Sequence, residues 1–206
     1  MSARDAILAR LRNAGPSSDR AAEARRLVET VERPHLAPAP APETFLQALA
    51  GPTLFATHDR IASPAGIPGA VGRYLAGQAL PAALYLPPDP FVAERDWSGF
   101  ALHDRCAPDE PAVLAVARAG IAETGSLIFD TGPAAPMLPN FLGLHLIVLL
   151  RVETIVLHLE DIPASPALPR AHYWVTGVSG TTDIEGQYVR GAHGPRFLHV
   201  ILLDGE

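Results

Sequence analysis

Lysine is absent from this sequence, and all 16 of its lysine-or-arginine positions are arginines. The absence excludes several enzyme classes, because a Schiff-base nucleophile, a phosphate-loop lysine and a kinase lysine all need a primary amine on a flexible side chain. The GxGxxG, GxSxG and phosphate-loop motifs are missing as well. Dinucleotide-binding enzymes, serine hydrolases of the elbow type and phosphate-loop enzymes are therefore excluded.

Cysteine is nearly absent, since Cys106 is the only one. An intrachain disulfide is excluded, and the chain alone cannot supply the four thiolates that usually hold an iron–sulfur cluster. Asp109 and Glu110 follow the cysteine, and acidic groups raise the pKa of a thiol when they lie close in space. We expect no catalytic thiolate and no cofactor on this chain.

Long apolar runs and excess positive charge are also lacking. The longest apolar runs, near 144–150 and 200–203, are far shorter than a membrane span, and the first residues do not form a targeting segment. The formal net charge of -6 means that the chain lacks the excess positive charge that typically binds nucleic acid. The sequence therefore predicts a cytoplasmic protein without a membrane span or a nucleic-acid partner.

The first part of the chain differs from the rest. Apolar residues recur at helical spacing within 2–14 and 20–32, and prolines then dominate the stretch before residue 42. We predict a helical arm with a proline-rich linker at 1–42 and one α/β domain at 43–206. Two helices this small cannot bury their apolar faces unaided, so the arm should dock on its own domain or on a neighbouring subunit, which is compatible with a homo-oligomer.

The domain alternates short apolar runs with helical patterns. Strands are expected at 53–57 and 83–86 around a helix at 67–77, followed by extended segments over 113–129, broken at Gly120 and Gly125, and a short helix near 137–142. The last third predicts strand 144–150, helix 152–159, strand 173–177, helix 183–190 and strand 197–204. This order favours an α/β fold with a mostly parallel sheet covered by helices.

A loop rich in glycine and hydroxyl groups follows the strand at 173–177. Its residues Ser179, Gly180 and Thr181, with Asp183 and Glu185 after them, could present backbone N–H groups to a carboxylate or phosphate. The alternative is structural, because Thr182 and Glu185 form a capping-box pattern that would satisfy the same N–H groups. Both interpretations stay open.

A second candidate is Glu123, which is followed by Thr124, Gly125 and Ser126. A carboxylate beside a glycine turn could act as a base or a nucleophile, or could only accept hydrogen bonds from nearby backbone N–H groups. We expect this turn, the 179–183 loop and His193 to meet in one cleft at the carboxyl ends of the sheet.

The histidines divide into two kinds. His193 follows the predicted helix end at Gly191, so a structural and a catalytic role are equally open. His145 and His199 lie inside apolar runs and should be buried and hydrogen-bonded. No pair of histidines has a metal-ligand spacing, and we predict no metal.

Three stretches carry a resemblance to a known family: AETGS at 122–126, Leu138-Pro139 with HLIV at 145–148, and VSGTTDIEGQYVRGAHGPRFLHVILLD at 178–204. In these stretches the chain resembles the lactate-utilisation protein C family of LUD domains, over roughly residues 43–206. The resemblance implies a fold similar to sugar-phosphate isomerases and CoA transferases. It also implies a role in the conversion of L-lactate to pyruvate, beside partner proteins that carry iron–sulfur clusters.

One position departs from the family pattern, where an arginine is replaced by Gly180. If that arginine grips an anion, Arg190 or Arg196 would have to replace it. The resemblance favours a non-redox component that binds a small carboxylate or a partner subunit. Two alternatives stay open: a stand-alone acyl or CoA transferase-like or ligase-like enzyme that uses Glu123, and a scaffold subunit without a ligand whose arm recruits partners.

Overall fold

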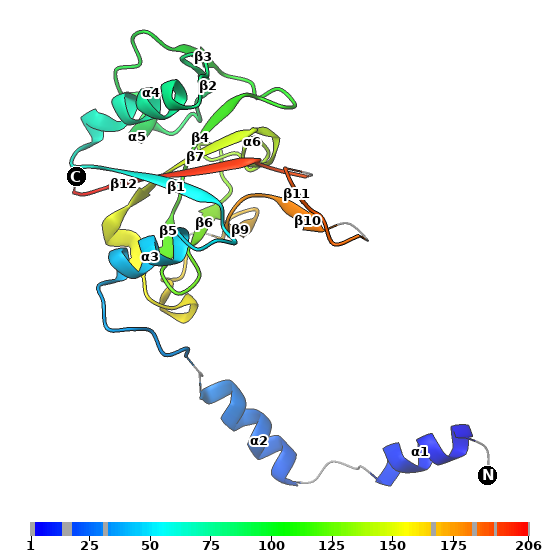
Figure 1. The fold of residues 1–206 in the computed structure, drawn as a ribbon. Helices are drawn as coiled ribbons and strands as arrows, with labels where there is room; N and C mark the ends of the chain where they lie inside the picture. Colours follow the sequence, from blue (N-terminus) through cyan, green and yellow to red (C-terminus); the bar gives the residue numbers. More distant parts are fainter. Residues whose placement is uncertain are drawn as a thin grey trace. The chain divides into compact units, whose positions relative to one another are not determined.

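A computed structural model describes residues 3–13, 18–30, 33–165, 168–182, 185–191 and 193–205. The chain divides into two compact units, Met1–His35 and Leu36–Glu206. The first unit contains α1 (Ala3–Asn13) and α2 (Ser18–Glu29), so both helices expected in the arm are confirmed (Figure 1). Their apolar side chains Ile7, Leu27 and Val28 are 60%, 65% and 83% exposed, so this unit does not bury them by itself.

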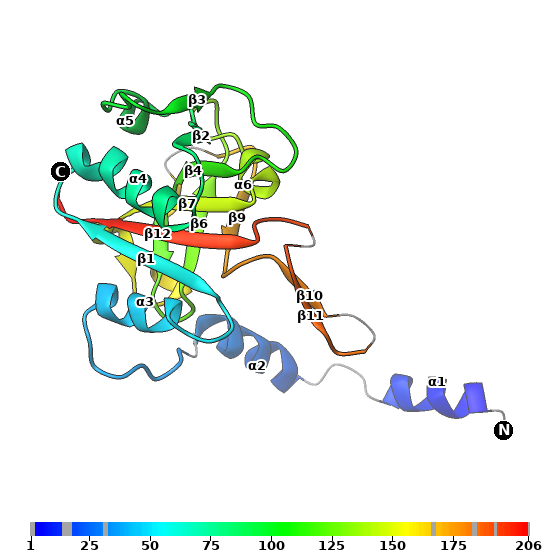
Figure 2. The same ribbon diagram turned by 45° about the horizontal axis from the view of Figure 1, so that its top comes forward.

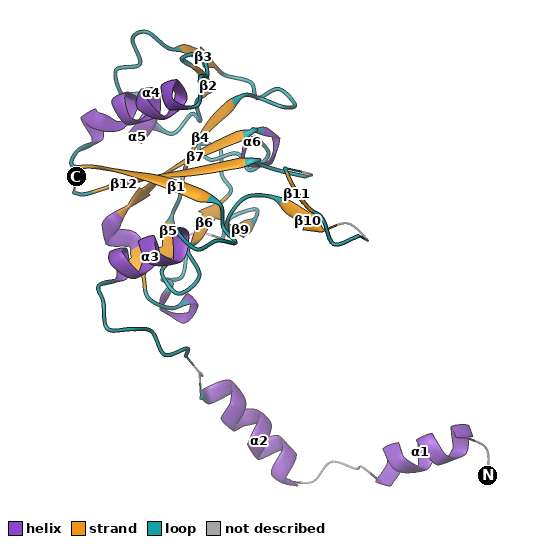
Figure 3. Ribbon diagram, in the orientation of Figure 1, coloured by secondary structure: helices purple, strands orange, loops and turns teal. Residues whose placement is uncertain are grey.

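The second unit is built on a six-stranded sheet in which every strand pair is parallel (Figures 1 and 3). The strand order is β1-β12-β7-β4-β2-β3. The strands are β1 (Ala56–Ile61), β2 (Ala83–Tyr85), β3 (Ala101–His103), β4 (Ala112–Val116), β7 (His145–Arg151) and β12 (Phe197–Leu203). The mostly parallel sheet expected from the sequence is confirmed, with the two longest apolar runs at its centre.

Both faces of this sheet are buried. On one face, α4 (Ile67–Gly77) packs Ile67, Val71 and Leu75 against odd-numbered residues of β7 and β12. On the other, α3 (Ala41–Leu49) packs Phe45 and Leu49 against even-numbered residues. Because side chains of a strand alternate between faces, strands buried on both sides need apolar residues at successive positions. Two further short helices, α5 (Pro90–Ala93) and α6 (Pro139–Leu142), belong to this unit.

A second, mixed sheet covers part of the α3 face. It has the order β8-β5-β6-β9, formed by β8 (Ile155–Val156), β5 (Ala119–Ile121), β6 (Ser126–Asp130) and β9 (His172–Val175). The expected break at Gly120 is wrong, because this residue lies within β5, where a Cβ would come within 2.9 Å of the Leu150 side chain. The expected break at Gly125 is confirmed by its φ of +68°, between β5 and β6.

The helix expected at 152–159 is wrong. The described residues form the 3-10 turns η2 (Val152–Thr154) and η3 (Leu159–Asp161) with β8 between them. Ile155 and Val156 pair with Gly120 and Ile121 of β5. β-Branched side chains are restricted in a helix and favour a strand, and pairing with the second sheet supplies the partner that such a strand needs.

The helix expected at 183–190 is also wrong. Strands β10 (Gly180–Thr182) and β11 (Tyr188–Arg190) instead form an antiparallel hairpin that projects from the second unit (Figures 1 and 2). The capping box at Thr182 and Glu185 therefore has no helix to cap, and Asp183 lies outside the described residues. None of the helices in the described part of the chain has the length and apolar character needed to cross a membrane.

Candidate functional site

The AETGS turn connects β5 to β6, and close packing sets its shape. A Cβ on Gly125 would come within 2.9 Å of the Leu54 side chain and 3.2 Å of the Leu49 backbone nitrogen. The positive φ of this residue adds a second reason for glycine. The turn is thereby pressed against α3 and the segment that precedes β1.

The carboxylate of Glu123 is fixed by two hydrogen bonds. Nδ1 of His158 donates to Oε2 at 2.9 Å, and the backbone N–H of Leu159 donates to Oε1 at 2.9 Å. The Glu123 and His158 side chains are only 11% and 13% exposed. Burial opposes ionisation of Glu123, but the hydrogen bonds from His158 and Leu159 outweigh it and hold the pKa of this carboxyl below its usual value. Glu123 is therefore an ionised, oriented group with both oxygens engaged.

The hydroxyl groups of the same turn bond to one another. Thr124 Oγ1 lies 2.7 Å from Ser126 Oγ, which lies 2.6 Å from Thr176 Oγ1 just after β9. Ser126 is 3% exposed, so this chain of hydroxyls satisfies groups that would otherwise be buried without partners. It also joins the AETGS turn to the start of the 176–179 segment.

The 176–179 segment then passes Leu54 on its way to the hairpin. The Val178 N–H donates to the Leu54 carbonyl at 3.0 Å, and a Cβ on Gly177 would come within 2.8 Å of Leu54 Cα. The side chain of the same leucine lies against Gly125. The structure therefore brings these two predicted motifs to the same residue, Leu54, which precedes β1.

The loop around Ser179 lies at the amino ends of the central strands. The Ser179 N–H donates to the Pro195 carbonyl at 2.9 Å, and the N–H groups of Arg196 and Phe197 donate to the Leu144 carbonyl. Phe197 and His145 begin β12 and β7. The expected position of this loop at the carboxyl ends of the sheet is therefore wrong, and the Ser179 N–H already has a protein acceptor.

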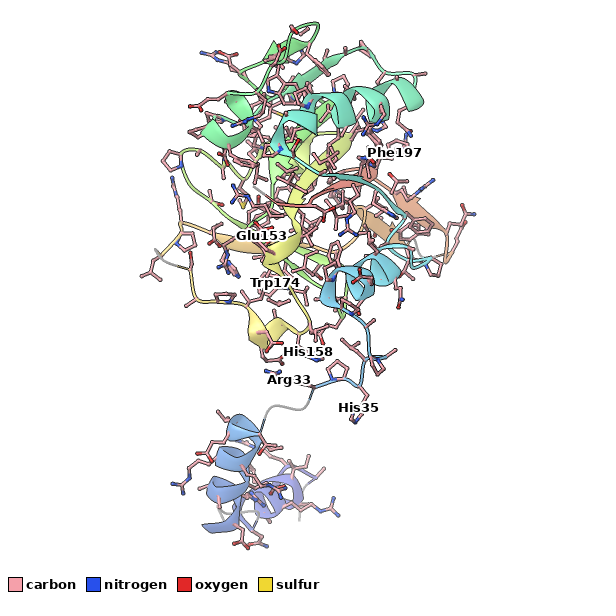
Figure 4. The ribbon with its side chains drawn as sticks, turned by 90° about the vertical axis from the view of Figure 1, so that its left-hand side faces the viewer. Arg33, His35, Glu153, His158, Trp174 and Phe197 are labelled. Atoms are coloured by element: carbon pink, nitrogen blue, oxygen red, sulfur yellow. The ribbon has the colours of Figure 1, made fainter. Side chains whose placement is uncertain are left out.

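Glu123 does not join the Ser179 loop and the segment of His193 in one cleft. His193 is exposed and precedes Gly194, where a Cβ would lie 3.1 Å from the Ser179 Cβ. Figure 4 shows His158, the partner of Glu123, well apart from Phe197 at the start of β12. The sequence could not reveal His158, because it lies 35 residues from Glu123 in a segment expected to be helical.

Gly180 and Thr181 are exposed in β10, where Tyr188 of the neighbouring strand β11 limits which side chains position 180 can accept. A side chain on Gly180 would collide with the ring and hydroxyl of Tyr188. That ring stacks on Phe55 with centroids 5.6 Å apart, and the Arg190 guanidinium lies 5.1 Å from the Phe55 centroid. Phe55, Tyr188 and Arg190 thus form one stack of exposed rings and charge.

Beside this stack lies a pocket of about 430 Å³, which we call the arginine pocket. Its lining residues are Tyr188, Val189, Arg190, Arg196 and Phe197. No acidic side chain occurs among these described lining residues. Two guanidinium groups without a carboxylate between them form a cationic site, and planar guanidinium groups bind carboxylates through paired hydrogen bonds. This is the feature of the hairpin region best suited to a small anion.

Comparison with known proteins identifies a domain in part of the chain. Residues 111–203 match the LUD domain. The chain carries a LUD domain. Lactate utilization protein C of Deinococcus radiodurans is 36% identical over 100 residues, which cover 45% of this chain and 46% of that protein. The match thus spans about half of the length of the curated relative.

A solved structure supports the fold of this LUD-domain chain. The crystal structure of a DUF162 family protein from Deinococcus radiodurans has a TM-score of 0.55 and 18% sequence identity, and covers 82% of this chain and 99% of that chain. The resemblance inferred from the AETGS and HGP stretches is confirmed. The LUD domain contains Glu123, the hairpin and both arginines of the arginine pocket, whereas Leu54 and Phe55 are supplied from outside the matched residues.

The two histidines of the apolar runs are buried in the LUD domain, as expected. His145 Nδ1 lies 2.9 Å from the Tyr74 hydroxyl, and His199 Nδ1 lies 2.8 Å from the Thr57 hydroxyl. Tyr74 also stacks on His199 at 4.2 Å. Burial lowers the pKa of His145, and it lowers the pKa of His199 to about 4. Both imidazoles are therefore neutral parts of the core near neutral pH.

Metal binding finds no support in the side-chain arrangement. Across the described ranges, no three histidine, cysteine, aspartate or glutamate side chains gather in a way that could hold an ion.

Proposed function

We propose that this LUD-domain protein serves in lactate utilisation in the cytoplasm, as a non-redox component that binds a small carboxylate and acts with iron–sulfur partner proteins. The name of the curated relative, lactate utilization protein C, supports the role. The single cysteine supports the division of labour, because the clusters of such a system would have to sit on partner chains.

The arginine pocket is the observation that supports a small carboxylate as the ligand. Arg190 and Arg196 line it without an acidic neighbour among its described lining residues. A carboxylate there would gain charge-assisted hydrogen bonds. Tyr188 also lines the pocket and is 48% exposed, and its hydroxyl would bond to a hydroxyl or keto group of the same acid. The volume of about 430 Å³ is at the small end of ligand pockets, which usually measure about 300–1,000 Å³.

The replacement at position 180 fits this assignment. Tyr188 occupies the space that a side chain on Gly180 would need, so an arginine at that position would displace the Tyr188 ring. Arg190 is the cross-strand partner of Gly180. The cation is then supplied from the opposite strand of the hairpin, with Arg196 as the second one.

Binding can be tested by thermal denaturation with L-lactate, pyruvate or benzylamine, since a ligand of the native state raises the melting temperature. We expect at least one of the two acids to raise it and benzylamine to leave it unchanged. The double substitution Arg190→Gln and Arg196→Gln should abolish the rise, whereas the exposed control Arg105→Gln should keep it. No rise with either acid, or a rise that survives the double substitution, would overturn the assignment.

The cellular role has its own test. Deletion of the gene should slow growth on L-lactate, and the unaltered gene should restore growth while the Arg190→Gln and Arg196→Gln double variant should not. Iron–sulfur proteins should co-purify with the tagged chain. Normal growth of the deletion strain on L-lactate would end the proposal.

The exposed apolar side chains of the arm support a binding site for these partner proteins on the arm. Ile7, Leu27 and Val28 are mostly exposed, and such side chains are stabilised when another surface covers them. Removal of residues 1–35 should abolish co-purification, whereas Glu123→Gln should leave it intact. Retention of the partners by the truncated protein would exclude the arm.

The oriented Glu123 supports a second candidate, an acyl or CoA transferase-like or ligase-like activity. In that reaction a carboxylate oxygen attacks the thioester carbonyl, an acyl-glutamyl anhydride forms, and CoA leaves as the thiolate. Mass spectrometry after incubation with acetyl-CoA should then detect an acyl adduct that Glu123→Gln lacks. An unmodified Glu123 would count against this candidate.

A further inference from the structure

A second polar cluster centres on Asp130, the last residue of β6. Nδ1 of His172 lies 2.6 Å from Asp130 Oδ1, and the Ser165 hydroxyl donates to Oδ2 at 2.7 Å. Arg118 Nε lies 3.2 Å from Oδ2. Burial opposes ionisation of Asp130, but the bonds from His172 and Ser165, with the charge of Arg118, hold its pKa below the usual value. A charged carboxylate is thus fixed by three separate segments of the chain.

This cluster forms one wall of a pocket of about 1,180 Å³, which we call the Asp130 pocket. Arg118, Thr131 and Arg170 line it beside Asp130. Met137, Leu138 and Leu168 line the apolar side, and the last two are 62% and 101% exposed. The pocket is larger than a three-carbon acid requires, and its apolar side chains would be covered by a ligand with an apolar body.

Two buried polar atoms of the lining residues lack hydrogen-bond partners within the described structure: Arg118 Nε and Thr131 Oγ1. The contact of Arg118 Nε with Asp130 is therefore an ion pair without hydrogen-bond geometry. A buried polar group left without a partner destabilises the fold. Both atoms are buried, so a ligand reaches this wall through the exposed parts of Arg118 and Asp130, whose side chains are 22% and 18% exposed.

The position of the pocket agrees with ligand binding. Arg118 follows β4, which ends at Val116, and Asp130 also lines a smaller cavity that reaches Tyr85 at the end of β2 and Val116. Open parallel sheets bind ligands outside the carboxyl ends of their strands. The Asp130 pocket lies on that side, whereas the arginine pocket lies at the amino ends of β7 and β12.

The charges of the lining residues define the ligand. Arg118 and Arg170 outnumber Asp130, so the pocket favours an anion. Asp130 would repel a second carboxylate placed directly on it, but it can accept a hydrogen bond from a hydroxyl. We infer that the Asp130 pocket binds a hydroxylated organic acid with an apolar body, whose carboxylate meets the arginines and whose hydroxyl meets Asp130.

This inference goes beyond the proposed function, because it concerns other residues and a larger ligand. Mandelate is a suitable probe, since it combines a carboxylate, an adjacent hydroxyl and a phenyl ring. Phenylacetate lacks the hydroxyl, and benzylamine has the opposite charge. In calorimetric titrations of the full-length protein, mandelate should bind at least tenfold more tightly than phenylacetate, and benzylamine should show no binding.

Two exposed positions offer variants that leave the core untouched. Arg170→Gln should weaken mandelate binding at least tenfold, and Leu168→Ser should weaken it as well, with an unchanged melting temperature. Arg196→Gln should leave mandelate binding unchanged, and Arg170→Gln should leave lactate or pyruvate binding unchanged. The binding proposals for the two pockets can therefore be refuted independently of each other.

Three results would overturn the inference. The first is absence of mandelate binding. The second is equal affinity for mandelate and phenylacetate, which would exclude recognition of the hydroxyl. The third is loss of mandelate binding in Arg196→Gln but not in Arg170→Gln, which would place the ligand in the arginine pocket.

Discussion

The ring of Tyr188 occupies the space next to Gly180 that a side chain at position 180 would need. The two residues lie on opposite strands of the β10–β11 hairpin, where Tyr188 pairs with Thr182 and Gly180 pairs with Arg190. Glycine at position 180 and tyrosine at position 188 therefore depend on each other, and neither can be understood alone.

This dependence predicts a coupling between substitutions. Gly180→Ala should push the Tyr188 ring off Phe55 and lower the free energy of unfolding by about 1 kcal/mol, since aromatic pairs contribute about 0.5–1.5 kcal/mol. In a Tyr188→Ala background the same change should cost much less, because the collision is gone. Urea denaturation of the four proteins measures the coupling, and an equal cost in both backgrounds would contradict the packing.

Acid should weaken the fold before its carboxylates titrate, because of His199. Burial lowers the pKa of this histidine to about 4, whereas an unfolded histidine titrates near ~6.5. Between these values the unfolded chain binds more protons than the native one. Stability is thus fully present above pH ~6.5 and falls as the pH drops toward ~4, by up to about 3 kcal/mol at ~1.4 kcal/mol per pKa unit.

The variant His199→Phe keeps a ring over Tyr74 but cannot take up a proton. Urea denaturation at pH 7.5, 6.0 and 5.0 should show a smaller loss of stability for this variant than for the unaltered protein. The exposed control His193→Gln should retain the full loss. An identical pH dependence in His199→Phe would show that His199 is not the source.

The Glu123–His158 pair should contribute to stability through its charge. Glu123→Gln should cost about 1–2 kcal/mol at pH 7, because hydrogen bonds to charged groups contribute about 1.5–3 kcal/mol and the amide retains part of them. The pKa of Glu123 is lowered in the fold, so the contribution is present above pH ~4.5 and is lost as the pH falls.

Denaturation at pH 7 and pH 3.5 tests this directly, and the gap between Glu123→Gln and the unaltered protein should narrow at the lower pH. In a His158→Gln background, Glu123→Gln should cost less than it does alone. A gap that is the same at both pH values would show that charge is irrelevant to the pair.

Cys106 should react slowly in the native protein. Burial raises the pKa of this thiol to about 11, and Glu110 adds to the rise, in the direction that the acidic residues after it predicted. With Ellman's reagent at pH 8, native Cys106 should react on the order of 100-fold more slowly than in urea, because only the thiolate attacks. Equal rates in the native and unfolded states would contradict a raised pKa.

The elements predicted correctly from the sequence share one property: each buries one or both of its faces in the hydrophobic clusters on the two sides of the central sheet. Strands β7 and β12 are apolar at successive positions because helix and sheet cover both of their sides. Helix α4 falls at the expected 67–77, because only one of its sides is buried. Local pattern and tertiary environment agree at these places.

The two wrong helices lie where pairing between strands decides the outcome, over a long range in one case and within a local hairpin in the other. Ile155 and Val156 have helical spacing with Val152 and Leu159, yet β5 offers them a strand partner about 35 residues away. In the hairpin, Gly186 has a φ of +79° and allows the chain to turn back, which the capping-box pattern did not anticipate. The site residues depend on the same long-range pairing, so the sequence could name Glu123 and Arg190 but not His158 or Phe55 beside them.

Strand β12 lies between β1 and β7, and His199 in it bonds to Thr57, 142 residues earlier. During synthesis at ~5–20 residues per second, β1 therefore waits about 7–30 s for its neighbour. From the synthesis of β7 until residues 197–203 are made, the edge of β7 that pairs with β12 has no strand beside it, which makes the nascent chain a natural client for chaperones. Slowing translation just before codon 197 should lengthen chaperone occupancy without any change in the finished fold.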